Sequence, residues 1–441
     1  MLSAVGTRMP RCERRRRSWT RKLPGRGKLI SYYSKKTIQM VSNSHRCLIL
    51  GNKVLIVIVL STLLGLLSAC TGSDSPYDSV EHFGKENIVR TSLVFDTLRL
   101  DAQYTSLSGQ WHMKDSLLCF VDEYAVGIKE YDLSGHFMGE HIRQGKGPEE
   151  VLAASFISTF DKSTGDFIMQ DSNCFIHRFS KDYKKLFSLN QAWFTALSPN
   201  YGDLGNKGWS DLYNHPDPEV PEMYEYNFEC NRMQAIDSAV IIPTITEHVS
   251  YNGYEKRQSK GFWTDSYIFI CFRPEVVESS KVIFGHYPPV YHKRNIPVFS
   301  KYDFYAEKDG LAVTFAADPR IFLMDYDGNV TGSFGFSEKG ISGKYPETTS
   351  FEEYESKCKK MRKEHGYYDR LVKCGDYIFR TCRLDKAAGT ILQIYDGNYN
   401  LVGRVPVSDG FEVIGEYDGT YYAYDSLDLD SEQFVFLSFK I

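Results

Sequence analysis

The side chains that most often carry enzymatic chemistry are spread thinly along this sequence. Its histidines show no HxH or HExxH spacing, so no pair on one strand or helix is arranged to share a metal ion. No GxSxG sequence provides the sharp turn that presents a nucleophilic serine in many hydrolases. Many aspartates stand next to Gly or Asn, where hydrogen bonds within a turn account for them. We therefore predict no metal and no cofactor, and a catalytic site would have to converge from distant segments.

A single cysteine stands where a lipid could be attached. Residues 54–67 are mostly aliphatic and follow basic residues, as in the apolar region of a signal peptide. The next residues complete a motif, Leu67-Ser68-Ala69-Cys70, that resembles the lipobox of bacterial lipoproteins. That resemblance implies a diacylglycerol on the Cys70 thiol and cleavage before it. An uncleaved membrane span is the alternative, but it needs about 20 apolar residues and this run is shorter.

The position of the lipobox predicts a different role for each segment of the chain. Residues 1–39 are rich in arginine and are predicted to be a basic extension, or to precede a true start at Met40. Residues 40–69 then form the signal peptide, residues 70–90 a polar tether, and residues 91–441 the folded domain. The expected partner of the N-terminal end is a lipid bilayer, reached through the acyl chains on Cys70.

The charge of the chain is very uneven. Residues 1–70 contain 14 Lys or Arg and one acid, a net charge of +13, and the whole chain carries −4. The remaining residues therefore carry a net charge of −17. Because nucleic acids are polyanions, we predict no nucleic-acid partner for the mature protein.

The cysteines after Cys70 do not suggest a disulfide framework. There are seven of them, none in a CxxC pair, and most lie in apolar stretches where a free cysteine packs as a small core residue. Cys374 and Cys382 flank a predicted strand, and a disulfide between them is the alternative.

A repeated pattern of short strands predicts the fold. Each unit has a strand, a connection, a second strand that ends in an aromatic residue, a polar turn and a third strand. The matching aromatic residues are Tyr131, Phe179, Tyr326 and Tyr395, at separations of 48, 147 and 69 residues. A multi-stranded period of about 40 to 50 residues is typical of propeller blades. We predict an all-β, six-bladed β-propeller, with seven blades as the alternative and residues 433–439 as the strand that closes the ring.

Two insertions interrupt the repeat. Residues 198–230 are rich in Asn, Gly, Pro and Asp, and exposed aromatic residues in such a loop would suit a binding surface. A self-packed loop is the alternative. Residues 350–366 predict a short helix with a capping box formed by Ser350 and Glu353, which would serve as a lid or brace. The aromatic residues of the first insertion are Trp209, Tyr213, Tyr224 and Tyr226.

A glycine-rich motif follows the first repeat. Residues 143–150 read Arg-Gln-Gly-Lys-Gly-Pro-Glu-Glu, and with residues 284–289 they resemble elements of TolB-like six-bladed propeller lipoproteins. The resemblance implies a propeller at the outer membrane or cell surface, with no established activity. A phosphate loop would require Lys-Ser/Thr and a helix. We instead assign structural roles to four residues of the motif: tight turning to Gly145 and Gly147, a fixed exit to Pro148, and backbone capping to Glu149 or its neighbour.

These patterns favour a non-catalytic function outside the cytoplasm. We expect a membrane-anchored binding or scaffold module for a protein, peptide or glycan. The alternative is a propeller hydrolase, lactonase or lyase whose residues meet in the central channel. A sensor or assembly factor of the envelope rests on fold analogy alone. Thr71, which follows the lipobox, favours the outer membrane, facing either the periplasm or the cell surface.

Overall fold

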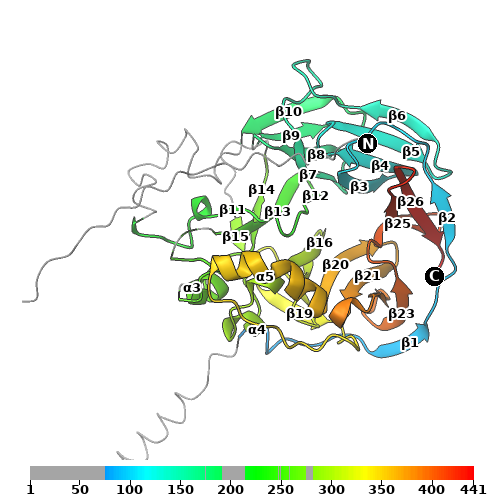
Figure 1. Ribbon diagram of the computed structural model, residues 1–441. Helices are drawn as coiled ribbons and strands as arrows, with labels where there is room; N and C mark the ends of the chain where they lie inside the picture. Colours follow the sequence, from blue (N-terminus) through cyan, green and yellow to red (C-terminus); the bar gives the residue numbers. More distant parts are fainter. Residues whose placement is uncertain are drawn as a thin grey trace, which may run out of the picture. The chain divides into compact units, whose positions relative to one another are not determined.

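The computed structural model describes residues 75–173, 175–190, 214–246, 248, 250–257, 259–274 and 282–441. These residues belong to one compact unit, and their strands form six sheets arranged around a central axis (Figure 1). The six-bladed β-propeller is therefore confirmed, and the seven-bladed alternative is wrong. The lipobox, Trp209 and Tyr213 lie outside the described residues, and Cys70 lipidation stays a prediction.

The first four blades follow one another along the chain, each counted from the axis outward. The first has β3 (Gly109–Lys114), β4 (Leu117–Asp122), β5 (Gly127–Asp132) and β6 (Phe137–His141). The second has β7 (Ser155–Phe160), β8 (Phe167–Asp171), β9 (Phe175–Phe179) and β10 (Lys185–Asn190). The third has β12 (Gln234–Ile236), β13 (Ala239–Ile245), β14 (Phe269–Phe272) and β15 (Val282–Phe284), with β11 (Glu225–Tyr226) also on β13. The fourth has β16 (Tyr302–Glu307), β17 (Gly310–Phe315), β18 (Ile321–Met324) and β19 (Val330–Phe334).

The last two blades each take a strand from the beginning of the domain. The fifth has β20 (Tyr367–Cys374), β21 (Tyr377–Arg383), β22 (Thr390–Tyr395) and β23 (Leu401–Val407), and β1 (Glu86–Arg90) pairs with β23 in parallel. The sixth has β24 (Glu412–Tyr417), β25 (Thr420–Asp428), β26 (Gln433–Phe439) and β2 (Asp96–Arg99) as its outermost strand. The prediction that residues 433–439 close the ring is wrong, because they form the third strand of their own blade and β2 joins the two ends.

The same turn links the third and fourth strands of several blades. In the first blade, the Asp132 carboxylate accepts hydrogen bonds from the backbone N–H groups of Ser134 and His136. Asp325 and Asp396 make the equivalent two bonds in the fourth and fifth blades. In the second blade the Ser180 hydroxyl takes the place of the carboxylate. The repeat in the sequence is thus the repeat of a hydrogen-bonded turn, as expected for Asx and Ser/Thr turn geometry.

The chain before β1 is not a free tether from residue 75 onward. Tyr77 is only 3% exposed; it packs edge-on against Phe322, and its hydroxyl donates a hydrogen bond to the His286 carbonyl. Phe83 donates its backbone N–H to the Ser333 carbonyl at 2.7 Å. The predicted tether of residues 70–90 is therefore wrong for its described part, because two buried or half-buried aromatic side chains hold it against the fourth blade.

The helix in the second insertion forms as predicted and acts as a brace. α5 (Phe351–Glu364) begins at Ser350, whose hydroxyl accepts a hydrogen bond from the Glu353 backbone N–H. Arg362 pairs with Glu229 at 2.5 Å and donates to the Val298 carbonyl at 3.1 Å, which fixes the helix to the third-blade loop. The other helical segments are α3 (Ser259–Thr264), α4 (Pro289–His292), η3 (Pro221–Met223), η4 (Pro297–Phe299) and η5 (Asp385–Ala387). No helix in the described ranges is both long enough and apolar enough to cross a membrane.

The glycine-rich motif makes a turn between the first two blades. The Glu150 carboxylate accepts the Gly147 backbone N–H at 2.6 Å, whereas Glu149 is exposed. A Cβ on Gly145 would lie 2.0 Å from the Glu150 carboxylate, so a larger residue there would displace the carboxylate from its bond to Gly147. Pro148 is exposed at the outside of this turn. The motif has the contacts of a blade-to-blade connection, with Glu150 as the capping residue.

The cysteines that the structure describes carry free thiols. Cys374 and Cys382 lie at opposite ends of the β20–β21 hairpin, where their cross-strand partners are Tyr377 and Tyr368. The alternative of a disulfide between them is therefore wrong. Burial raises the pKa of both thiols to about 12.

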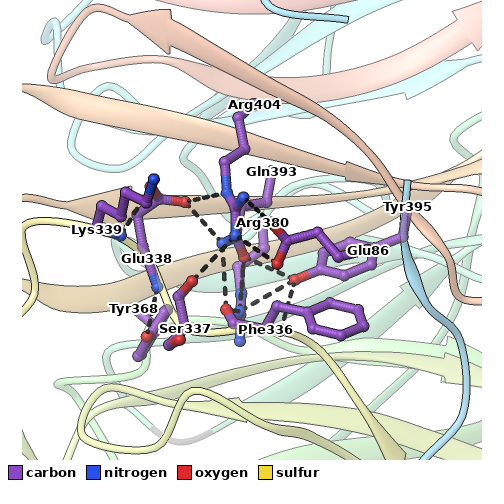
Figure 2. A network of polar contacts seen from close by, with 10 residues as sticks. All are labelled: Glu86, Phe336, Ser337, Glu338, Lys339, Tyr368, Arg380, Gln393, Tyr395 and Arg404. Atoms are coloured by element: carbon purple, nitrogen blue, oxygen red, sulfur yellow. Dashed lines mark hydrogen bonds and ion pairs between the residues drawn. The ribbon is translucent and has the colours of Figure 1, made fainter. Parts of the chain in front are cut away.

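A buried arginine organises the fifth blade (Figure 2). Arg380 is 0% exposed, and its guanidinium group donates to Gln393 Oε1 and to the carbonyls of Pro319 and Phe336. Its guanidinium carbon lies 4.3 Å from the centre of the Tyr368 ring. The network continues from Gln393 to Glu338, Arg404 and Glu86, so it links β1 to the blade.

Candidate binding site: the central channel

The inner strands of the six blades enclose a cavity of about 750 Å³. Because each inner strand begins its blade, all six run in the same direction along the axis. The starts of the strands therefore meet at one end of the channel, and their ends meet at the other. The lining comes mainly from the inner strands β3, β7, β12, β16, β20 and β24, from the residues that precede β12, and from the turns that follow β3, β7 and β9. Phe120, Tyr424 and Phe434 of β4, β25 and β26 also contribute.

Near the starts of the strands, two arginines and two carboxylates form a group that we call the arginine tier: Arg232, Asp303, Arg370 and Glu412. Arg232 pairs with Asp303 at 3.0 Å and with Glu412 at 2.5 Å. Arg370 is 3.6 Å from the other oxygen of Glu412. The tier thus joins four separate blade regions, and only Asp303, at 0% exposure, is hidden completely from the cavity.

The pKa values in the arginine tier follow from burial and from these ion pairs. Burial raises the pKa of Asp303, and Arg232 and Arg370 oppose that rise. Burial alone would also raise the pKa of Glu412, but Arg370 and Arg232 hold it below its usual value. Glu412 in turn raises the pKa of Arg370. At neutral pH the tier therefore presents two permanent positive charges held by carboxylates of the wall.

At the other end of the channel, four lysines form what we call the lysine mouth: Lys114, Lys162, Lys181 and Lys373. Lys114 donates to the Lys181 carbonyl at 2.7 Å, and its Nζ lies 4.2 Å from the centre of the Tyr183 ring. Lys162 donates to the Ala306 carbonyl at 2.8 Å, and Lys373 pairs with Glu307. Burial lowers the pKa of Lys162. The mouth therefore collects cationic side chains from three blades.

A histidine and a serine lie together in the channel wall, but they do not form a nucleophilic pair. His112 Nε2 is 2.9 Å from the Ser158 hydroxyl, which itself donates to Gln110 Oε1 at 2.9 Å. The imidazole thus acts as the donor, and the serine proton is committed to the glutamine. Ser158 is 2% exposed, and burial together with Arg232 lowers the pKa of His112 to about 4. A neutral imidazole that supports the β3–β7 contact is the consistent interpretation.

The aromatic residues predicted to line a binding loop are placed elsewhere. Tyr224 and Tyr226 are 0% and 4% exposed, so the prediction that they face a ligand is wrong. The Tyr224 hydroxyl bonds to the Pro218 carbonyl, and Tyr226 packs in the core of the third blade as part of β11. The self-packed alternative holds for both residues. No group of three His, Cys, Asp or Glu side chains suited to a metal ion occurs among the described residues.

Sequence reasoning missed the channel residues. The first strand of the first unit shows polar side chains at alternate positions, Gln110, His112 and Lys114 in β3, whereas its second strand, β4, is mostly apolar. That contrast is a signal for the inner strands of a propeller. It cannot identify which side chains meet across the axis, because the partners come from different blades.

Among the comparisons with known proteins, similarity to a solved structure supports the fold. No family model matches the chain, and no curated protein is similar to it in sequence. The crystal structure of a member of the DUF4221 family from Bacteroides vulgatus ATCC 8482 matches with a TM-score of 0.59 at 12% identity, over 81% of this chain and 99% of that chain. A presumed exported protein of Bacteroides fragilis NCTC 9343 matches with a TM-score of 0.46 at 12% identity, over 82% of this chain and 99% of that chain. The chain is a six-bladed β-propeller with structural neighbours among Bacteroides proteins, one of them in the DUF4221 family.

Proposed function

We propose that the protein is a lipid-anchored binding module outside the cytoplasm and that its central channel holds the ligand. The cavity of about 750 Å³ at the axis is the observation that carries this proposal. Cavities of roughly 300 to 1,000 Å³ accommodate small ligands, and a few polar groups in them fix the orientation of the ligand. The arginine tier and the lysine mouth supply such groups, and the rigid inner strands hold them in place.

The proposed anchor keeps the propeller close to the membrane. Six residues separate Cys70 from Tyr77, the first aromatic residue that docks on the propeller. A fully extended chain gains at most about 3.6 Å per residue, so this link spans about 25 Å or less. A module on so short a link would act on ligands at the membrane surface. The lipobox and Thr71 favour the outer membrane as that surface, and the resemblance to TolB-like propeller lipoproteins supports the same location.

Replacing Cys70 with serine should abolish the anchor, because an alcohol does not substitute for the thiol that accepts the diacylglycerol. We expect complete loss of radiolabelled fatty-acid incorporation and release of the protein from the membrane fraction. Cys119→Ser is the matched control, since Cys119 is buried in the first blade and should leave labelling unchanged. Lipid labelling of Cys70→Ser at the level of the unchanged protein would contradict the proposed anchor.

A variant that fills the channel tests the binding site. Gln234 lines the cavity, is half-buried and makes no side-chain hydrogen bond among the described residues. Gln234→Trp should therefore occupy the cavity with little effect on folding. We expect ligands found by thermal-shift screening of envelope extracts to lose at least about tenfold in affinity, since a blocked pocket forfeits most of its contacts. Lys360→Trp on the exposed face of α5 is the control.

The same screen separates binding from catalysis. Each ligand that stabilises the protein is incubated with it, and the mixture is analysed for cleaved or rearranged products. If the protein converts a ligand and Gln234→Trp abolishes the conversion, the protein is an enzyme with its active site in the channel and not a binding module. Ligands that bind the variant and the unchanged protein equally well would place the binding surface outside the channel and refute the proposal.

A further inference from the structure

We propose that the channel ligand carries an oxyanion, a carboxylate, sulfate or phosphate group, which enters through the lysine mouth and is held by Arg370. This inference rests on the proposed function, because it specifies the chemistry of the same site. It takes the ligand to be a small molecule of about the size of a disaccharide, which suits the cavity volume.

The first argument is the charge of the lining. The cavity wall has six cationic side chains and three carboxylates, although residues 71–441 as a whole carry −17. Two of the three carboxylates are committed: Asp161 is 1% exposed and caps the turn after β7, and Glu412 is held by Arg232. Asp115 is exposed at the mouth. An enclosed positive wall in an acidic protein attracts anions and selects against cations.

Carboxylates behind the wall balance this excess, so the positive charge is concentrated at the surface of the cavity and the negative charge lies behind it. Asp303 and Glu307 neutralise one charge each on Arg232 and Lys373. Glu130 lies 3.6 Å from Lys114 and balances a third charge, and its oxygens also accept from Tyr183 and contact His141. Lys162 and Lys114 donate hydrogen bonds to backbone carbonyls, at 2.8 and 2.7 Å respectively. A neutral carbonyl accepts the hydrogen bond but does not neutralise the charge of the lysine.

The second argument is the state of the Arg370 guanidinium group. Its side chain is 26% exposed toward the cavity, and its one ion pair, with Glu412, is 3.6 Å long and formed by Nε. Among the described residues, no hydrogen bond from its two terminal nitrogens is present. An arginine fork with its terminal donors free is arranged to bind a planar or tetrahedral oxyanion through two parallel hydrogen bonds.

The test measures binding of four probes by isothermal titration calorimetry: a uronate disaccharide, a sulfated disaccharide, a neutral disaccharide of the same size, and inorganic phosphate. We expect at least one charged probe to bind ten times more tightly than the neutral one, and to weaken as salt is raised, because screening reduces the attraction. The charged probe that binds best identifies the oxyanion, and tight binding of phosphate alone assigns a free anion as the ligand.

Three variants locate the contact. Arg370→Gln should weaken the charged probe at least tenfold, and Arg370→Lys should restore part of the loss because it keeps the charge without the fork. Lys373→Gln should weaken it about threefold, and Lys360→Gln on the exposed face of α5 should leave it unchanged. Circular dichroism and the melting temperature show whether each variant is folded.

Two outcomes overturn the inference, and they are distinct from failure of the proposed function. Equal binding of the neutral and charged disaccharides would leave a channel-binding module without a charged ligand. The oxyanion inference would also be wrong if none of the three charged probes showed saturable binding while other ligands still bound the unchanged protein more tightly than Gln234→Trp. If no ligand distinguishes Gln234→Trp from the unchanged protein, the proposed function itself fails.

Discussion

Replacing Arg380 with methionine is expected to lower the free energy of unfolding by about 3 kcal/mol or more, because hydrogen bonds to a charged group are worth about 1.5 to 3 kcal/mol each. The guanidinium group is fully enclosed and donates to Gln393 at 2.6 and 3.0 Å, to the Pro319 carbonyl at 2.8 Å and to the Phe336 carbonyl at 2.9 Å. Methionine has a similar length but no donor. It would leave the Pro319 carbonyl without a partner among the described residues, whereas Gln393 Oε1 keeps its bond from the Tyr395 hydroxyl and the Phe336 carbonyl keeps its bond from the Gln393 amide. An acceptor left unpaired costs about 1 to 3 kcal/mol.

The effect should extend beyond the fifth blade. The Gln393 amide N–H donates to the Glu338 carboxylate, which also accepts from Arg404. Arg404 in turn donates to Glu86 of β1 (Figure 2). Removing Arg380 frees Gln393 to move and weakens this line of contacts. The free energy of unfolding in urea measures the loss, and limited proteolysis between residues 75 and 100 reports whether β1 is released.

Two controls make the Arg380 result specific. Arg380→Lys keeps the charge but cannot donate to Gln393 and both carbonyls at once, so it should recover less than half of the loss. Arg99→Met removes an arginine whose side chain is 57% exposed and whose ion pair with Asp428 is 3.6 Å long, so its effect should stay below about 1 kcal/mol. A loss below about 1 kcal/mol for Arg380→Met would mean that the network is not stabilising.

The blades could be predicted because their signals are local. The turn at Asp132 returns at Asp325 and Asp396 with the same two hydrogen bonds, so the sequence repeats wherever the turn geometry repeats. α5 was predictable for the same reason, since Ser350 and Glu353 form its cap within four residues. Local hydrogen bonding leaves a local pattern, and such a pattern can be found in one sequence.

The channel could not be predicted because its contacts are distant. Arg232, Asp303, Arg370 and Glu412 meet although 180 residues separate the first from the last. Their positions across the axis depend on which blades are neighbours and on how the inner strands are aligned, and neither leaves a spacing in the sequence. Each of the four is a polar residue in or just before an inner strand, and nothing in its local sequence identifies its partners.

Composition was misleading in two places. The insertion that contains Tyr224 and Tyr226 has the Asn, Gly, Pro and Asp content of a surface loop, yet both rings are buried in the third blade. Residues 75–90 have the polar content of a linker, yet Tyr77 and Phe83 anchor them. A few aromatic side chains decide where a polar segment lies, because burying one of them outweighs the solvation of several small polar neighbours.

Shortening the chain so that it begins at Asp101 is expected to prevent the propeller from closing. The deletion removes β2, which pairs with β26 from Asp96 opposite Ser438 to Arg99 opposite Val435. It also removes Phe95, whose ring lies 5.5 Å from that of Phe439. The last blade would then end at β26 with unpaired backbone groups along an alternating apolar strand, which is a template for association between chains.

The expected result is a fall in soluble monomer of about tenfold or more, measured by size-exclusion chromatography against a chain that begins at residue 75 and is expressed in equal amounts. A chain that begins at Ser92 is the matched control, because it loses Tyr77 and β1 but keeps Phe95 and β2. That control should remain monomeric, with a lower free energy of unfolding, since β1 covers a blade that already has four strands and β2 completes one that has three. Equal yields of monomer from the two truncated chains would show that β2 is dispensable and that the ring closes through side-chain packing between the first and sixth blades.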